Sequence, residues 1–310
     1  INIFKIKKHL MFTKKSVLII PTKDRNTQLK KTLNQFLSLK VSFKKIIIVD
    51  SSNDRNLKEN KIFLKNKKIQ HVYSQPSISK QRNIGLVKAL KIKRADYIFL
   101  LDDDITFEKK AFKEINKEII KNKGNKQIVG FGFNPKNNFT KNWFDKIKES
   151  KISQLLGLYH EKQGKILKSG WQTKIQNVKK NLKSNWASSA ALVLKFDKIK
   201  NKRFDESFGK YSYLEDLDFS LKFKPNIFLI VSKACFFHYN NIERTSFEFG
   251  FIEVVNRFKV VKKNKLNFFS YFKTIILKTV MNLIYFAVGK FHFLMRFIGN
   301  FSGIIYIIFF

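Results

Sequence analysis

Short apolar runs alternate with amphipathic stretches over the first hundred residues of the chain. Buried strands are predicted where such a run meets a proline, a turn or an acidic residue, at 16–20, 45–50 and 96–101 and, more weakly, at 69–73. Residues 24–39 and 79–90 have apolar side chains at helical spacing, with Asp24 or Asn26 as the candidate cap of the first helix. Strands and helices that alternate at intervals of about 20 to 30 residues favour an α/β fold with a doubly wound, mostly parallel sheet.

The pattern becomes mixed after residue 105 and changes again after residue 240. Strands are predicted near 128–133, 187–194 and 228–237, with a long polar stretch up to Lys183 and an acidic segment at 204–219. The predicted parts of the chain are therefore a basic N-terminal segment (1–15), an α/β domain (16–240, with halves at 16–105 and 106–240) and a C-terminal helical region (241–310).

The C-terminal region is rich in Phe and Ile. Its most apolar segments, 274–288 and 291–310, are interrupted by Lys278, Lys290, His292 and Arg296. A membrane-spanning helix needs about 20 apolar residues with few charges, so amphipathic helices in the plane of a membrane fit better. We expect this region to hold the protein peripherally on the cytoplasmic side of the inner or plasma membrane, with an anionic membrane surface as partner. A hairpin packed on the preceding domain, or a dimer interface, is the alternative.

The composition narrows the class of protein. With 44% hydrophobic and 27% charged residues and only 12 Gly and 4 Pro, the chain is neither disordered nor collagen-like. Its single cysteine, Cys235, excludes an internal disulfide and a Cys-rich zinc module. The 62 Lys and Arg against 23 Asp and Glu give a formal charge of +39, which favours anionic partners. These basic residues are spread over the whole chain, so the charge alone identifies no binding surface.

Residues 1–15 mix Lys with Ile and Phe and lack the uninterrupted apolar core of a signal peptide, so export is not indicated. Because the sequence begins at Ile1, we expect the natural N-terminus to lie upstream.

Three consecutive acidic residues, Asp102, Asp103 and Asp104, follow a predicted strand. Carboxylates this close repel one another and are stable together only where a cation or hydrogen-bond donors compensate. Asp102 and Asp104 could share a divalent metal with the diphosphate of a nucleotide, because Mg²⁺ and Mn²⁺ prefer oxygen ligands and substrate phosphates. In such sheets ligands bind outside the carboxyl ends of the strands. A solvated acidic turn that caps a helix from Thr106 is the structural alternative.

A second acidic cluster, Glu215, Asp216 and Asp218, lies more than a hundred residues later in a chain poor in acidic residues. A carboxylate held opposite a leaving group suits a general base that acts on a hydroxyl. An acid-rich first turn of a helix, which the helix dipole favours, is the alternative. His238 follows a predicted strand and is either a third metal ligand or an ordinary satisfied polar residue.

Two arginines complete the set of candidates. Arg25 and Arg82 lie beside predicted strand ends, where guanidinium groups meet phosphate. The sequence has no Walker A loop, no Gly-rich dinucleotide fingerprint and no nucleophile-elbow serine.

The order of these motifs resembles that of the inverting family-2 glycosyltransferases of GT-A fold, which are Rossmann-like. The motifs are VLIIPTKDRNTQLKKTL, IIIVDSSND, SISKQRNIGL, YIFLLDDDI, NWASSAALVL with RFDESFGKYSYLEDLDFSLKF, and then His238. The similarity covers roughly residues 16–260, and EVVNRFKVVKKN is similar to the rhamnosyltransferase-like branch. The family usually has Gly where this chain has Ser189 and commonly Arg where it has Lys222, two departures that concern the acceptor pocket.

The resemblance implies a role for each candidate residue. Residues 16–105 form the nucleotide-binding half, in which Thr22, Arg25 and Asp50 line the base and ribose and Arg82 lies on the donor loop. Asp102 and Asp103 face the nucleotide. The implied ligands of a Mg²⁺ or Mn²⁺ ion are Asp104, Asp102 and His238. In the acceptor half, Asp216 is the implied catalytic base and Glu215 its neighbour on the acceptor side.

The implied activity is transfer, with inversion, of a hexosyl or deoxyhexosyl group from a UDP- or dTDP-linked sugar to a glycan or lipid-linked acceptor, in cell-envelope polysaccharide or glycolipid synthesis. A nucleotidyltransferase of similar fold is one alternative, although it would usually have a Gly-rich basic loop where this chain has IIPTKDRN. A basic nucleic-acid-binding protein is another, but it would interleave aromatic and basic residues on one face, so no nucleic acid is expected as a partner. The two intact acidic clusters argue against a third, a catalytically inactive membrane scaffold.

Overall fold

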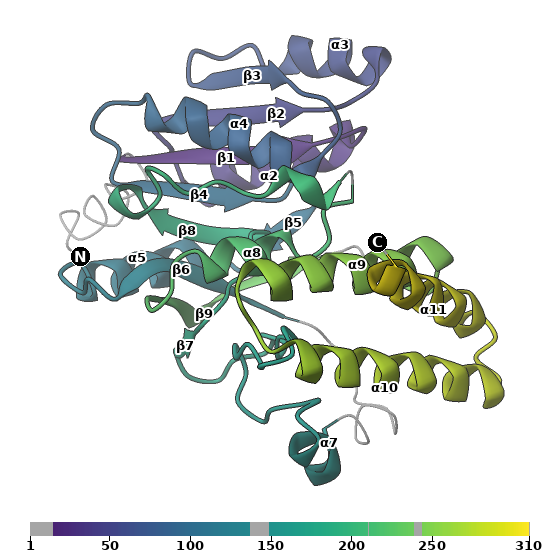
Figure 1. The fold of residues 1–310 in the computed structure, drawn as a ribbon. Helices are drawn as coiled ribbons and strands as arrows, with labels where there is room; N and C mark the ends of the chain where they lie inside the picture. Colours follow the sequence, from purple (N-terminus) through teal and green to yellow (C-terminus); the bar gives the residue numbers. More distant parts are fainter. Residues whose placement is uncertain (1–14, 137–148, 210, 239–243, 310) are drawn as a thin grey trace. The chain divides into compact units, whose positions relative to one another are not determined.

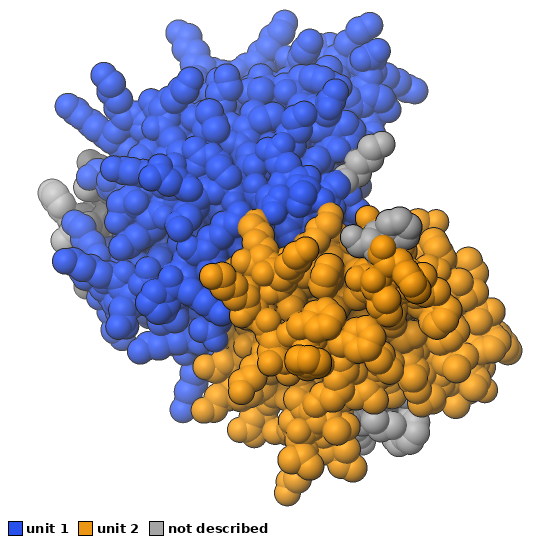
Figure 2. Space-filling view, in the orientation of Figure 1, with its two compact units in different colours: residues 1–137, 175–240 blue, residues 138–174, 241–310 orange. Residues whose placement is uncertain are grey.

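The computed structural model describes residues 15–136, 149–209, 211–238 and 244–309. The chain forms two compact units (Figure 2): unit 1 comprises Ile1–Asn137 and Ile175–Asn240, and unit 2 comprises Asn138–Lys174 and Asn241–Phe310. Unit 2 thus combines the C-terminal region with part of the long polar stretch that was predicted to belong to the 106–240 half. The basic segment expected at 1–15 lies outside the described residues except for Lys15.

A nine-stranded sheet forms the centre of unit 1 (Figure 1), in the order β3-β2-β1-β4-β8-β6-β9-β5 with β7 paired to β9. Its parallel half consists of the four strands predicted first along the chain: β1 (Ser16–Thr22), β2 (Lys45–Asp50), β3 (Ile69–Tyr73) and β4 (Tyr97–Leu101). Thr22 pairs with Asp50 in the β1–β2 register, so the carboxyl ends of these two strands lie side by side.

The other half of the sheet is mixed rather than parallel. Its strands are β5 (Ile105–Phe107), β6 (Ile128–Pro135), β7 (Leu182–Ser184), β8 (Ala191–Lys195) and β9 (Ile227–His238). β8 is antiparallel to β4 and to β6, β5 and β7 are antiparallel to β9, and β6 is parallel to β9. Between β6 and β8 the chain passes through unit 2 instead of a single crossover helix, so β8 need not run parallel to its neighbours.

Helices cover both faces of the sheet. Because successive strand residues point to opposite sides, each strand contributes side chains to a core on either face. On one face Leu18 and Ile20 of β1 share a core with α2 (Asn26–Ser38) and α5 (Ala111–Lys121). On the other, Val17 and Ile19 share a core with α4 (Ile78–Leu90) and α8 (Glu215–Leu221). Gly85 allows α4 to approach β1 closely, since a Cβ there would overlap the Ile19 side chain. The doubly wound arrangement is therefore confirmed, with parallel pairing concentrated in the first half of the sheet.

The start of α2 differs from the prediction. Its N-cap is Arg25, without a side-chain hydrogen bond, so the prediction of a cap at Asp24 or Asn26 is wrong. Asp24 has a positive φ of 54°, and its carboxylate accepts from the Asn53 backbone N–H and the Asn56 amide instead. These bonds join it to the start of α3 (Asp54–Phe63), a mostly polar helix that the apolar pattern did not predict.

Unit 2 contains α7 (Lys151–Leu155) and three long helices, α9 (Phe247–Lys263), α10 (Phe268–Ala287) and α11 (Phe293–Phe309). The predicted C-terminal helices are thus present. Glycines let α9 and α11 pack backbone to backbone: a Cβ at Gly250 would meet the Arg296 carbonyl, and a Cβ at Gly299 would meet that of Phe247. Within the described part of the chain, no helix combines the length and the apolar content needed to cross a bilayer.

Candidate active site

The three aspartates lie directly after β4, in a turn that is largely buried. Asp103 and Asp104 are only 3% and 7% exposed, and Thr106 lies in β5 rather than in a helix. The helix that follows, α5, begins at Ala111. The alternative of a solvated acidic turn capping a helix from Thr106 is therefore wrong, and the buried carboxylates need partners.

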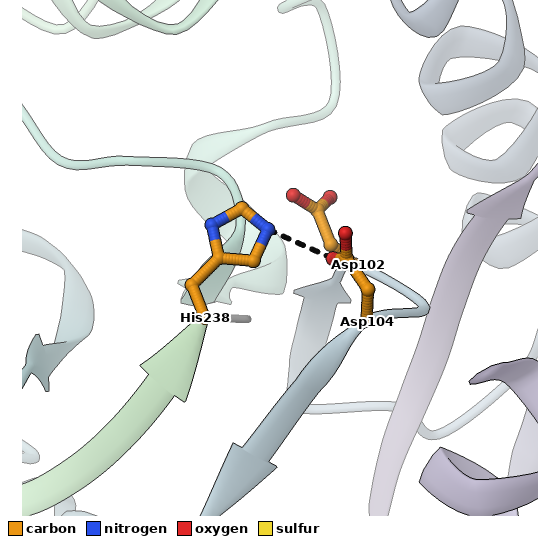
Figure 3. A group of neighbouring side chains, drawn as sticks. All are labelled: Asp102, Asp104 and His238. Atoms are coloured by element: carbon orange, nitrogen blue, oxygen red, sulfur yellow. Dashed lines mark hydrogen bonds and ion pairs between the residues drawn. The ribbon is translucent and has the colours of Figure 1, made fainter. Parts of the chain in front are cut away.

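Asp102, Asp104 and His238 form a cluster at this turn (Figure 3). Each offers one ligand atom, and these atoms all lie within 4.8 Å of one another. The antiparallel pairing of β5 with β9 brings His238 close to the aspartates, because it places His238 opposite Ile105, the residue after Asp104. His238 Nε2 lies 2.8 Å from Asp104 Oδ1, and this hydrogen bond raises the pKa of His238 although burial opposes it. Two carboxylates and an imidazole are a donor set that suits a divalent cation.

Arg25 and Thr22 bind the inner side of the same turn. Arg25 Nη1 lies 2.6 Å from Asp104 Oδ2 and 3.2 Å from Asp103 Oδ1, and Thr22 Oγ1 donates to Asp103 Oδ2 at 2.6 Å. Burial raises the pKa of Asp103 to about 6, against the hydrogen bond from Thr22 and the charge of Arg25. Asp103 thus links the turn to β1 and to the start of α2. The nucleotide contacts implied for these three residues stay a prediction.

Arg82 connects the two acidic clusters. Its guanidinium is buried, with Nη2 3.1 Å from Asp102 Oδ1 and Nη1 2.6 Å from Glu215 Oε1, and it lies over the Phe204 ring. Burial raises the pKa of Glu215 to about 7, with Asp216 raising it further and Arg82 opposing both. The phosphate contact expected for Arg82 stays a prediction, and in the described structure its guanidinium lies between two carboxylates.

The second acidic cluster occupies the first turn of α8, and its members have different surroundings. Glu215 and Asp216 are partly exposed, whereas Asp218 is fully buried and its Oδ2 lies 3.2 Å from Lys222 Nζ. Lys222 also donates to the Arg203 carbonyl. Asp218 and Lys222 therefore serve packing within unit 1, and Glu215 and Asp216 are the members available to the site.

Asp50, at the end of β2, has its own set of hydrogen-bond donors. It is fully buried, and its carboxylate accepts from Ser52 N–H at 2.9 Å and Asn60 Nδ2 at 2.7 Å and lies 2.9 Å from His71 Nε2. Burial alone would raise the pKa of Asp50, but these hydrogen bonds outweigh burial and lower it. Asp50 was predicted from the sequence, whereas Asn60 and His71 were not. A histidine on a predicted strand, in a chain with five histidines, was a usable signal for His71.

Asn83 was also missed. Its Nδ2 donates to the Phe204 carbonyl and to Glu206 Oε1, and its Oδ1 accepts from Phe204 N–H. These bonds attach the segment that precedes α8 to α4 and so help to fix Glu215 and Asp216. The sequence signal that could have identified Asn83 is its position next to Arg82 in the QRN motif.

Acidic and basic side chains are interleaved at this site. The five carboxylates of Asp102–Asp104, Glu215 and Asp216 are set against Arg25, Arg82 and the imidazole of His238. Asp102 and Asp104 were expected to need a compensating charge, and Arg82 and Arg25 supply part of it. Because Asp102, Asp104 and His238 offer two carboxylates and an imidazole within 4.8 Å of one another, these residues fit the metal that the motifs predicted.

Comparison with known proteins agrees with this geometry. The family model for glycosyl transferase family 2 matches residues 17–194, more than half of the chain. Among solved structures, the chain is similar to a crystal structure of GalNAc-T7 with UDP, GalNAc and Mn²⁺, with a TM-score of 0.57 and 15% sequence identity. The match covers 80% of this chain and 47% of that one, so the present chain spans about half the length of this relative. At such identity the likeness shows the fold alone, and the GT-A, Rossmann-like class is confirmed. No curated protein matches the sequence.

Proposed function

This chain belongs to glycosyl transferase family 2, and we propose that it transfers a hexosyl or deoxyhexosyl group from a nucleotide-diphosphate sugar to an acceptor hydroxyl with inversion. The observation that carries the proposal is the meeting of the two acidic clusters, with Asp102, Asp104 and His238 on one side of Arg82 and Glu215 and Asp216 on the other. Such a site has separate groups for the leaving diphosphate and for the attacking hydroxyl.

Asp102, Asp104 and His238 would hold a Mg²⁺ or Mn²⁺ ion. When bound, the ion would supply positive charge where the departing diphosphate becomes more negative. The GalNAc-T7 crystal structure, with UDP and Mn²⁺, supports this class of donor and cofactor. Arg25 already contacts Asp104, so it is placed to add charge on the same side of the site.

Asp216 is the proposed general base. Glu215 accepts a charged hydrogen bond from Arg82 at 2.6 Å, and a proton taken up there would weaken that ion pair. Asp216 lies in the first turn of α8, where the helix dipole favours its ionised form. It would remove the proton from the acceptor hydroxyl as the oxygen attacks the anomeric carbon on the face opposite the diphosphate. The carbon–oxygen bond to the diphosphate breaks in the same displacement, so no bond to the enzyme forms.

The finer assignments rest on sequence motifs. The similarity of EVVNRFKVVKKN to the rhamnosyltransferase-like branch supports a UDP- or dTDP-linked deoxyhexose or hexose as donor. Thr22, Arg25, Asp50 and Asp103 are the proposed determinants of nucleotide binding. A glycan or lipid-linked acceptor in cell-envelope polysaccharide or glycolipid synthesis fits the same branch. Peripheral attachment to the cytoplasmic face of a membrane is a separate proposal that rests on unit 2.

A donor screen tests the proposal. The purified full chain is incubated with UDP- and dTDP-linked sugars, simple glycoside acceptors and Mn²⁺ or Mg²⁺, and nucleoside diphosphate release is measured. We expect release with at least one donor, loss of release in chelator, and a product whose anomeric configuration by NMR is opposite to that of the donor. Retention of configuration would contradict the direct displacement. Release of pyrophosphate in a parallel incubation with UTP or dTTP and a sugar 1-phosphate would identify a nucleotidyltransferase instead.

A further inference from the structure

The outer sides of α10 and α11 carry apolar side chains that the catalytic proposal does not use. On α10, four such residues recur every three to seven positions and are 40–82% exposed: Phe269, Ile276, Val280 and Leu283. Buried residues of the same helix, such as Tyr271, lie on its opposite side. This spacing places the exposed residues on one face of the helix.

α11 continues the pattern. Phe291 (73% exposed) in the turn before the helix leads to Met295, Ile298, Phe301 and Ile305, all 39–53% exposed. The buried residues of α11 are Gly299, Asn300 and Gly303, on its other side. Because Val288 and Phe291 in the connecting turn are also exposed, the two stripes are continuous. We call this surface the α10–α11 face; its members are Phe269, Ile276, Val280, Leu283, Ile284, Val288, Phe291, Met295, Ile298, Phe301, Ile305 and Ile308.

The inner sides of these helices already have partners within unit 2. Trp171, Val254, Val261, Tyr271 and Ile275 form a core there. The buried polar groups are also bonded: Asn282 Nδ2 donates to Asn300 Oδ1 at 2.7 Å, and Arg296 Nη2 lies 2.7 Å from Glu253 Oε2. The α10–α11 face is therefore a second, outward-facing apolar side of helices whose inward side is complete.

The face is large for a protein in water. Twelve side chains that are each about half exposed, at roughly 150–250 Å² for an aromatic residue, present on the order of 1,000 Å² of apolar surface. The largest apolar patch of a typical monomer is about 300–600 Å². An apolar partner is thus required.

The charge of this part of the chain indicates which kind of apolar partner the α10–α11 face fits. From Val254 to Phe310 the sequence has nine Lys and Arg and no Asp or Glu. Lys273 is exposed within the α10 stripe itself, and Lys262, Lys263 and Lys265 are exposed at the end of α9 and just after it. We propose that the α10–α11 face lies on the surface of a bilayer that contains anionic lipid, with both helices in the membrane plane and these lysines at the headgroups.

A second copy of the chain is a poorer occupant. In a symmetric dimer each face would meet its own copy, which would bring the basic residues of the two copies together without any acidic residue from 254–310 to pair with them. The formal charge of +39 on each chain adds to that repulsion. An anionic bilayer has the opposite charge and supplies the same apolar environment.

Vesicle binding of the full chain tests the proposal. The parent protein is sedimented with vesicles of phosphatidylcholine alone or with one third phosphatidylglycerol. The triple variant Phe269→Ser, Phe291→Ser, Ile305→Ser removes exposed apolar area from the face without touching its buried side. The matched control, Leu37→Ser, Ile62→Ser, Leu155→Ser, removes three apolar side chains that are 68–89% exposed elsewhere. Lys273→Glu is a second variant that changes the charge of the face alone.

We expect the parent and the matched control to bind the anionic vesicles equally, and more tightly than the neutral ones. The triple variant should bind about tenfold more weakly or worse, and Lys273→Glu should weaken binding to anionic vesicles only. A triple variant or a Lys273→Glu variant that binds like the parent would overturn the proposal. A parent that binds neither vesicle, or that forms a dimer in solution which the triple variant disrupts, would overturn it as well.

Nucleoside diphosphate release, assayed without vesicles, separates this proposal from the catalytic one. The triple variant should release nucleoside diphosphate from the donor as the parent does, because the substituted residues all lie in unit 2 and the proposed catalytic residues in unit 1.

Discussion

Replacement of Arg82 by methionine tests the bridge between the two acidic clusters. The methionine side chain is of similar length but removes the cation that lies 3.1 Å from Asp102 Oδ1 and 2.6 Å from Glu215 Oε1. In the parent protein Asp102 and Glu215 share one buried guanidinium, and in the variant these two carboxylates lose that shared cation. Arg82→Lys keeps the charge, but a single ammonium cannot reproduce the planar fork that reaches both carboxylates.

The magnitude follows from the burial of the bridge. Removing one partner of a buried ion pair costs about 3–5 kcal/mol, because the remaining charge is left uncompensated. We expect Arg82→Met to lower the free energy of unfolding by that amount near neutral pH, a large part of the roughly 5–15 kcal/mol that stabilises a typical protein. Arg82→Lys should lose about 1–3 kcal/mol, the scale of one or two charged hydrogen bonds.

The loss should depend on pH. The pKa of Glu215 is raised by burial to about 7 from an ordinary value of 4.5, so its ionisation destabilises the fold as the pH rises through that interval. Without Arg82 the same pKa rises further, and the penalty for ionising Glu215 grows. The deficit of Arg82→Met should therefore be larger at pH 8 than at pH 5, where Glu215 is protonated in both proteins.

Urea unfolding followed by circular dichroism at pH 5 and pH 8 measures these differences. Lys88→Met, which removes a half-buried lysine from the same helix, is the matched control and should change stability by less than about 1 kcal/mol. A deficit for Arg82→Met no larger than that of the control, or one that is equal at the two pH values, would refute the bridge as a stabilising element.

Three further predictions concern the metal, the base and the helix packing. Asp104→Ala should abolish turnover even with excess Mn²⁺ and weaken Mn²⁺ binding measured by electron paramagnetic resonance; full activity of the parent in a strong chelator would contradict the metal assignment. Asp216→Asn should lower kcat by roughly a hundredfold or more and leave the donor Kd nearly unchanged, whereas weaker nucleotide binding at an unchanged kcat would place Asp216 in the donor site. Gly299→Val should lower the free energy of unfolding, measured by thermal unfolding, by about 1–3 kcal/mol, because its side chain would meet the Phe247 carbonyl. The control Gly124→Ala, which has open space around it, should be nearly neutral, and equal effects of the two variants would argue against close α9–α11 packing.

Local pattern was sufficient to predict the parallel half of the sheet. β1, β2 and β4 are runs of consecutive apolar residues, because strands buried on both faces need no polar alternation. The same reasoning missed α3, whose one buried residue is Asn60, because a mostly polar helix has no apolar periodicity to detect. It also expected a mostly parallel sheet, since strand direction after β6 depends on the path of the chain and not on local residue order.

The candidate site was predicted in its residue types and not in its pairings. Asp102, Asp104, His238 and Glu215 were all selected from motifs and strand ends, but nothing local indicates that Arg82 lies between residues 20 and 133 positions away. The inward direction of Asp103 was equally hidden, because it depends on Thr22 and Arg25, which lie about 80 positions earlier.

The sequence by itself determined the short-range properties: which segments are apolar enough to be buried strands, where carboxylates follow them, and that the last two helices carry cations without acids. Only the tertiary structure decided which charges neutralise one another and which apolar stripes remain uncovered. The physical reason is that an ion pair or a packed helix face needs two partners, and the fold brings together partners that are far apart along the chain.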